Sequence, residues 1–139
     1  MNRTHRWPVR VYYEDTDSGR IVYHANYLKY AERARSELLR EIGLPNRVVA
    51  ERWQMGFAVR RCAMDFRLPA VLDDELHVES RLTHIGGARV KAIQDVCRGA
   101  DLLVRVDVEI VCLGHEGRAV RLPKDVAAAM TPYLHERSE

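Results

Sequence analysis

Residues 13–27 read Tyr13-Glu14-Asp15-Thr16-Asp17-Ser18-Gly19-Arg20-Ile21-Val22-Tyr23-His24-Ala25-Asn26-Tyr27. The stretch joins a short apolar alternation to a helix, and it places two carboxylates, an imidazole and an amide in one loop: Asp15, Asp17, His24 and Asn26. Loops held on a rigid scaffold commonly carry binding and catalytic groups. This loop also ends at a predicted helix N-terminus, where free backbone N–H groups favour negative charge. The stretch is therefore the first candidate for a functional site.

The loop leads into a helix that we predict over about residues 26–42. Its apolar face recurs at helical spacing and comprises Tyr27, Ala31, Ala34, Leu38 and Ile42. Asn26 has the side chain of an N-cap, and Gly43 is suited to end the helix. A second, short helical turn is predicted around residues 46–52.

Most of the remaining chain is predicted to form strands. The first apolar alternation is Val9, Val11 and Tyr13. In the second, Phe57, Val59 and Ala63 form the apolar face and Arg60 and Met64 the other face. Three further alternations span residues 76–83, 88–98 and 102–112. Gly86-Gly87 and residues 114–117 are turn signals, and residues 124–135 suggest a tail helix. One long helix among about five strands predicts an α+β domain with an antiparallel sheet, which spans residues 1–139 as one unit.

The composition limits which partners and which cellular compartment we expect for this chain. The 139 residues carry a net charge of +2 with both signs mixed, which argues against a nucleic-acid partner. Because no apolar run is long enough for a signal peptide or a membrane span, we expect a cytoplasmic protein. Cys62, Cys97 and Cys112 are widely spaced and suggest neither a disulfide framework nor a zinc site.

Several longer motifs carry a family resemblance. They are Arg6 to Asp17, Val22-Tyr23-His24-Ala25-Asn26-Tyr27, Glu32-Arg33-Ala34-Arg35, Val59-Arg60-Arg61, Pro69 to Asp74 and Leu122-Pro123-Lys124. The sequence resembles the bacterial acyl-CoA thioesterases of the 4-hydroxybenzoyl-CoA thioesterase type, and most closely the group associated with the Tol–Pal envelope system. The resemblance covers nearly the whole chain. It implies the hotdog fold, in which a curved antiparallel sheet wraps around one long helix.

The resemblance also implies roles for the loop residues. Asp17 is expected to be the catalytic carboxylate, and the backbone N–H of His24 is expected to hydrogen-bond the thioester carbonyl. Asp15 is interpreted as a residue that fixes the loop. The residues alone leave a simpler interpretation open, in which Asp17 only closes an Asx turn with Ser18 and Gly19. No metal and no cofactor are expected, because Asp15, Asp17 and His24 lack convincing ligand spacing.

The assembly and the substrate follow from the same resemblance. It implies a homo-oligomer, a dimer or a tetramer, with the active site at a subunit interface and an acyl-CoA substrate. An acyl carrier protein and envelope-associated proteins are further candidate partners. The basic residues Arg60, Arg61, Arg89 and Lys91 are candidates for contacts with the CoA phosphates, although a solvated strand face explains them equally well.

Some alternatives stay open at the level of sequence. Asp17 suits either a nucleophile or a general base. Two rival functions are a hotdog hydratase or dehydratase and an acyl-carrier or envelope-complex binding protein with residual activity. Arg20 departs from the family, whose members often have Gly at this position, so a left-handed backbone here would be strained.

Overall fold

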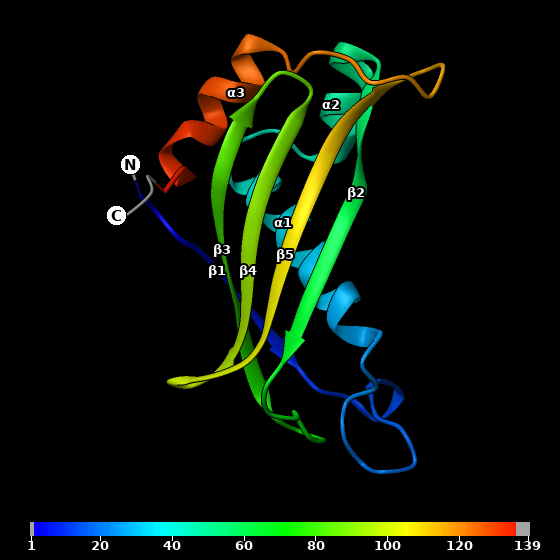
Figure 1. Cartoon of the computed structure of the whole chain (residues 1–139), viewed down its shortest axis with the longest axis vertical. Coiled ribbons are helices and arrows are strands. Elements are labelled where there is room, and N and C mark those ends of the chain that lie inside the picture. The colour runs from blue at the N-terminus through cyan, green and yellow to red at the C-terminus, as the bar shows by residue number, and fades with distance from the viewer. Residues whose placement is uncertain (1, 136–139) are drawn as a thin grey trace.

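The computed structural model describes residues 2–135, which form a curved five-stranded sheet with one long helix across a single face (Figure 1). The strands are β1 (His5–Arg10), β2 (Met55–Phe66), β3 (Glu75–Gly86), β4 (Arg89–Arg98) and β5 (Asp101–Gly114). They pair antiparallel in the order β1-β3-β4-β5-β2. The predicted α+β hotdog architecture is confirmed.

The long helix α1 (Asn26–Glu41) matches its predicted span, but its N-cap differs from the prediction. Ala25 is the N-cap residue, and Asn26 is the first residue of the helix, with its side chain turned back to the loop. The helix ends as predicted at Gly43, whose φ is +82°. The N–H of Leu44 donates to the carbonyl of Leu39 at 2.9 Å, which satisfies a carbonyl that the helix end would leave free.

Two shorter helices complete the fold. Helix α2 (Asn46–Trp53) lies where the second helical turn was predicted. The tail helix is shorter than predicted, because α3 covers only Lys124–Met130 and the 3-10 helix η2 follows at Thr131–Tyr133. Pro132 lacks the N–H that a continuing α-helix would need. Among residues 2–135, no helix has the length and apolar character needed to cross a membrane.

The core lies between α1 and the inner face of the sheet. Tyr30, Ala31 and Ala34 on the apolar face of α1 are almost fully buried, as are Val78 and Val96 on the strands beneath it. The helix packs closest against β1, β3 and β4, so it covers one half of the sheet. The half formed by β5 and β2 receives less of the helix, and β2 is an open edge strand.

β2 contains a β-bulge that changes which side chains face the core. The register shifts between Val59 and Arg61, so Arg60 is the extra residue. Beyond a bulge the alternation of faces is reversed. The prediction that Ala63 is on the apolar face and Met64 on the polar face is therefore wrong, since Met64 packs against the core.

The first strand also differs from its prediction. β1 ends at Arg10, and Val11 is the last fully buried residue of the alternation. Residues Tyr13–Asp15 form a 3-10 helix, η1, in which Tyr13 is 81% exposed. The turn begins because the backbone N–H of Tyr12 donates to the carboxylate of Asp15 at 2.9 Å.

Candidate active site

Asp17 lies at the base of a small hairpin in the loop before α1. An isolated bridge pairs Thr16 with Val22, and the N–H of Asp17 donates to the carbonyl of Ile21 at 3.0 Å. The carboxylate of Asp17 accepts the N–H of Gly19 at 2.8 Å. This contact forms the Asx turn that the sequence suggested as the simpler interpretation of Asp17. The side chain is exposed, so a second lone pair and the other oxygen remain accessible to a substrate.

Asp15 holds this loop against the start of α1. Its side chain is 8% exposed, and its backbone carbonyl accepts the N–H of Tyr23 at 2.9 Å and the amide of Asn26 at 2.8 Å. Burial raises the pKa of the Tyr30 hydroxyl, and the neighbouring Asp15 carboxylate raises it further. These contacts agree with the interpretation of Asp15 as a residue that fixes the loop.

Two aromatic side chains lie close to His24 before the start of α1, and a third packs against one of them. The ring centroid of His24 lies 4.5 Å from that of Tyr23 and 6.3 Å from that of Phe66. Phe66 also lies 5.9 Å from Tyr27, whose hydroxyl accepts the N–H of Ala70 at 3.1 Å. The end of β2 is thereby fastened beside the helix N-terminus.

The amide groups at the beginning of α1 differ in their partners. The N–H of Asn26 donates to the carbonyl of Tyr23 at 2.8 Å, and that of Tyr27 donates to the carbonyl of His24 at 3.3 Å. Within residues 2–135, no backbone acceptor is found for the N–H of His24 or of Ala25. Two donors at the positive end of the helix are therefore available to an oxyanion or a carbonyl.

The structure does not join Asp17 to His24 directly. Both side chains are exposed, and no hydrogen bond or ion pair connects them among the described residues. They belong to the same loop, in which Asp17 lies within the hairpin closed by Thr16 and Val22 and His24 lies beyond it. Sequence reasoning missed Phe66, because its proximity to His24 depends on how the far end of β2 meets the loop.

Arg20, at a position where family members often have Gly, adopts a left-handed backbone conformation. Its φ is +66°, in the left-handed region that glycine adopts more readily. The N–H of Arg20 donates to the carbonyl of Asp17 at 2.9 Å, so the turn forms in spite of the side chain. The strain lies three residues from the candidate carboxylate.

Four basic residues singled out by the sequence lie around Glu109 on β5. Arg60, Arg89 and Lys91 reach its carboxylate at 3.4, 3.6 and 3.9 Å, and the Glu109 side chain is 11% exposed. Arg61 pairs with Glu109 in the strand register. Since one carboxylate faces three cations, the cluster retains positive charge that suits a phosphate.

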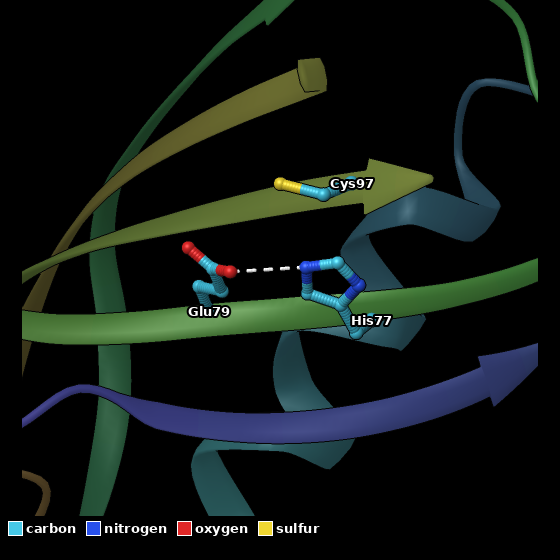
Figure 2. Close-up of side chains that lie close together, drawn as sticks. All are labelled: His77, Glu79 and Cys97. Carbon is cyan, nitrogen blue, oxygen red and sulfur yellow. Dashed lines mark hydrogen bonds and ion pairs between the residues drawn. The ribbon is translucent and has the colours of Figure 1, made fainter. Parts of the chain in front are cut away.

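A second polar cluster lies on β3 and β4, where His77, Glu79 and Cys97 have potential ligand atoms within 4.8 Å of one another (Figure 2). The Nδ1 atom of His77 accepts from the Arg6 guanidinium at 3.1 Å, which leaves the proton on Nε2. Nε2 lies 3.0 Å from Glu79 and donates to it. This chain of hydrogen bonds accounts for the arrangement without a metal ion.

Comparison with known proteins identifies the family. A family model described as the thioesterase-like superfamily matches residues 11–130. The chain belongs to the thioesterase-like superfamily. Superfamily members of similar sequence include a Haemophilus influenzae protein named acyl-CoA thioesterase YbgC. It is 40% identical over 124 residues, covering 88% of this chain and 91% of the relative.

Other members of the superfamily agree in sequence and in structure. The Escherichia coli O6:H1 protein named acyl-CoA thioester hydrolase YbgC is 40% identical over 132 residues, covering 92% of this chain and 97% of the relative. A solved structure of a probable thioesterase from Bartonella henselae has a TM-score of 0.84 at 38% identity, covering 87% of this chain and 100% of that one. The resemblance to hotdog thioesterases is confirmed, and the roles of Asp17 and His24 stay predictions.

Proposed function

We propose that this chain hydrolyses an acyl-CoA thioester to a free carboxylic acid and CoA. The observation that carries the proposal is an exposed Asp17 carboxylate in the same loop that ends at the start of α1, where the N–H groups of His24 and Ala25 have no backbone acceptor among residues 2–135. The superfamily and the names of the relatives support the reaction and the acyl-CoA substrate.

The thioester carbonyl binds at the start of α1, where the N–H groups of His24 and Ala25 donate to its oxygen. As the carbonyl becomes tetrahedral, these donors stabilise the oxyanion by roughly 3–4 kcal/mol for each well-placed donor. Asp17 either attacks the carbonyl carbon to give a mixed anhydride or removes a proton from an attacking water. The C–S bond breaks and the CoA thiolate leaves, and it needs little help from an acid.

Replacement of Asp17 by Asn tests the proposal. Asn retains an oxygen that can accept the Gly19 N–H, so the turn is kept while the charge is removed. We expect thiol release from acyl-CoA to fall at least about 100-fold with the fold intact, because an essential base or nucleophile contributes that much or more. Retention of more than about a tenth of wild-type kcat would refute the role of Asp17.

The variant His24→Ala is the matched comparison for Asp17→Asn. It removes the imidazole and keeps the backbone donor, so we expect a smaller loss of kcat than Asp17→Asn causes. An equal loss with normal substrate binding would assign direct acid–base work to the imidazole. Circular dichroism and light scattering of both variants separate chemical effects from misfolding.

A single turnover in ¹⁸O-water distinguishes the two mechanisms of Asp17. If Asp17 is the nucleophile, which we favour, water that attacks the aspartyl carbon of the anhydride leaves label on the peptide that contains Asp17. A general base leaves all label in the product acid. Mass spectrometry of that peptide, together with rapid-quench trapping of an acyl-enzyme, decides between them, and absence of both signals would establish the general base.

The proposal extends to assembly and setting, on the strength of the sequence resemblance. The chain acts as a homodimer or homotetramer in the cytoplasm and takes part in lipid metabolism. It associates with the Tol–Pal envelope system or with acyl carrier protein. The basic cluster of Arg60, Arg61, Arg89 and Lys91 would receive CoA phosphates. Co-purification of Tol–Pal proteins with a tagged chain, compared with an unrelated hotdog protein, tests the association.

A further inference from the structure

One arginine from β4 closes the loop that connects β2 to β3. Arg98 is the last residue of β4, and its Nη1 atom donates to the carboxylate of Asp74 at 2.7 Å and to the carbonyl of Pro69 at 3.3 Å. These acceptors lie at the two ends of residues 69–74, which we call the 69–74 loop. The Asp74 side chain is only 17% exposed, so solvent and salt screen this ion pair less than a fully exposed one.

The carboxylate of Asp74 also shapes the loop from within. It accepts the backbone N–H of Val71 at 2.9 Å, and the N–H of Asp74 donates back to the carbonyl of Val71 at 3.1 Å. Asp73, inside this turn, has a φ of +70°, a left-handed conformation that residues other than glycine keep only where the surrounding contacts hold it. The shape of the turn therefore depends on the Asp74 carboxylate, and Arg98 fixes that carboxylate in place.

This loop is hydrogen-bonded to the hairpin that contains Asp17. The N–H of Val22 donates to the carbonyl of Ala70 at 2.9 Å, and an isolated bridge pairs Ile21 with Val71. Ile21 is also the residue whose carbonyl accepts the N–H of Asp17. The backbone of Asp17 is therefore held by a strand segment that the loop holds in turn.

The same loop contacts the first turn of α1. The N–H of Ala70 donates to the hydroxyl of Tyr27 at 3.1 Å, and Ala70 is fully buried. Burial raises the pKa of the Tyr27 hydroxyl, and Arg98 is close enough to lower it in part. Ala70 thus bonds the hairpin through its carbonyl and α1 through its N–H, so one residue of the loop connects the two parts of the candidate site.

We propose that Arg98 is a positioning residue for thioester hydrolysis, because by closing the 69–74 loop it fixes the Asp17 hairpin relative to the start of α1. The inference rests on the proposed function, since the geometry that Arg98 holds is that between the Asp17 carboxylate and the N–H groups of His24 and Ala25. A misplacement of about 1 Å can lower a rate by roughly 100-fold, so a contact remote from the chemistry affects kcat. Arg98 acts through the loop and not on the substrate.

The variant Arg98→Met removes both hydrogen bonds and keeps much of the apolar stem. We expect kcat for thiol release to fall about 10- to 100-fold while KM changes less than about threefold, because the loss is one of alignment. Arg98→Lys should retain kcat within about threefold, because Nη1 alone makes both contacts and one ammonium has enough donors to replace it. Wild-type kcat in Arg98→Met, or no rescue by lysine, would overturn the proposal.

Hydrogen exchange gives a readout that does not require turnover. In Arg98→Met, the peptide that contains Asp17 and Val22 should exchange at least about tenfold faster than in the wild type, while peptides from β5 keep their protection. Arg105→Met is the matched control, because Arg105 forms an ion pair of similar length and exposure, 2.8 Å from Asp95. It should change neither kcat nor the exchange of that peptide. Equal losses in both variants would mean that general destabilisation explains the effect, and the proposal would fail.

The experiment separates this inference from the proposed function. A wild type that releases no thiol from any acyl-CoA refutes the function, whereas an active wild type with an inactive Asp17→Asn and an unaffected Arg98→Met refutes only the role of Arg98. If Arg98→Met loses the oligomeric mass of the wild type, the arginine serves a subunit contact and the inference is wrong. If it does not fold, Asp74→Asn replaces it, since the amide oxygen still accepts the Val71 N–H while the charge is lost. Unchanged kcat and exchange in a folded Asp74→Asn would then refute the inference.

Discussion

At the scale of single residues, Asp17 is already engaged in the loop that precedes α1. One carboxylate oxygen closes the turn by accepting the Gly19 N–H, and the side chain stays exposed, so the proposed chemistry would use a carboxylate that also holds its own turn. The same loop stores backbone strain at Arg20, where φ is +66°. Strain at a position that any glycine would relieve suggests that the Arg20 side chain has a use, such as shaping entry to the site.

Arg20→Gly measures that strain. An L-residue in the left-handed region costs about 1–2 kcal/mol, and glycine loses about 0.5–1 kcal/mol in chain entropy, so we expect a gain of about 0.5–1 kcal/mol in the free energy of unfolding. Urea denaturation of Arg20→Gly and of Arg20→Ala, which keeps the strained backbone, provides the measurement. A glycine variant less stable than the alanine variant contradicts the interpretation. A changed ratio of rates across acyl-CoA lengths would show that Arg20 shapes entry.

The candidate site could be predicted only in part at this scale. Asp15, Asp17 and His24 were identified because unusual polar groups cluster in a short segment. The contact of His24 with Phe66 could not be predicted, because it depends on the path of a strand that begins far along the chain. The contacts of Arg98 escaped prediction for the same reason, since they join the end of β4 to a loop earlier in the chain.

At the scale of elements, local signals predicted the helices and hairpins well. Helix α1 has a clear apolar face and a glycine at its end, and β3 and β4 are joined at Gly87, whose φ is +61°. The errors arose where one residue changes the pattern. The bulge at Arg60 reverses the faces of β2, and the Tyr12–Asp15 contact ends the first strand early.

An ion-pair network around the buried carboxylate of Asp95 gives stability a pH dependence. Arg105 contacts both carboxylate oxygens of Asp95 at 2.8 and 3.0 Å, and Arg81 lies 3.2 Å away. Burial alone would raise the pKa of Asp95, but the hydrogen bonds from Arg105 and Arg81 outweigh it, so the pKa lies below the ordinary 3.8. The stabilisation is therefore complete above about pH 4 and is lost as pH falls through the lowered pKa.

Asp95→Asn isolates this contribution. At pH 7 we expect a loss of about 1–3 kcal/mol in the free energy of unfolding, because two arginines lose a charged acceptor. As pH falls below 3.8 and through the lowered pKa, the wild-type carboxylate takes up a proton in the folded state as well, so the difference from the variant should shrink. Urea titrations at a series of pH values measure it, and a difference that stays constant down to pH 2 would contradict the assignment.

At the scale of the whole molecule, one half of the sheet is open to the second copy that we propose. Helix α1 covers β1, β3 and β4, while β2 forms an open edge and exposes Val59 and Phe66, each 49% accessible. An unpaired edge strand beside apolar surface is a hazard unless another chain covers it. The proposed oligomer removes both the open edge and the apolar exposure.

Cys62→Lys tests whether β2 joins the subunits. Cys62 is exposed in the middle of β2, so a lysine there brings like charges together when two copies of the strand meet. Light scattering across a dilution series should give two or four times the 16.0 kDa of one chain for the wild type and for the control Cys62→Ser. The lysine variant should shift toward one chain and lose thiol release. A fully active wild-type monomer would refute a site shared between subunits.

During synthesis, β2 is made well before β5, the strand with which it pairs. The last residue of β2 is Phe66 and the last residue of β5 is Gly114, so 48 residues must still be translated after β2 before its whole pairing strand exists. At roughly 5–20 residues per second, this interval lasts about 2–10 s. Both edges of β2 are unpaired until the first residues of β5, from Val104 on, are available. Nascent chains on neighbouring ribosomes of one mRNA therefore expose the same unpaired strand to each other. This favours assembly, or aggregation, before either chain leaves its ribosome.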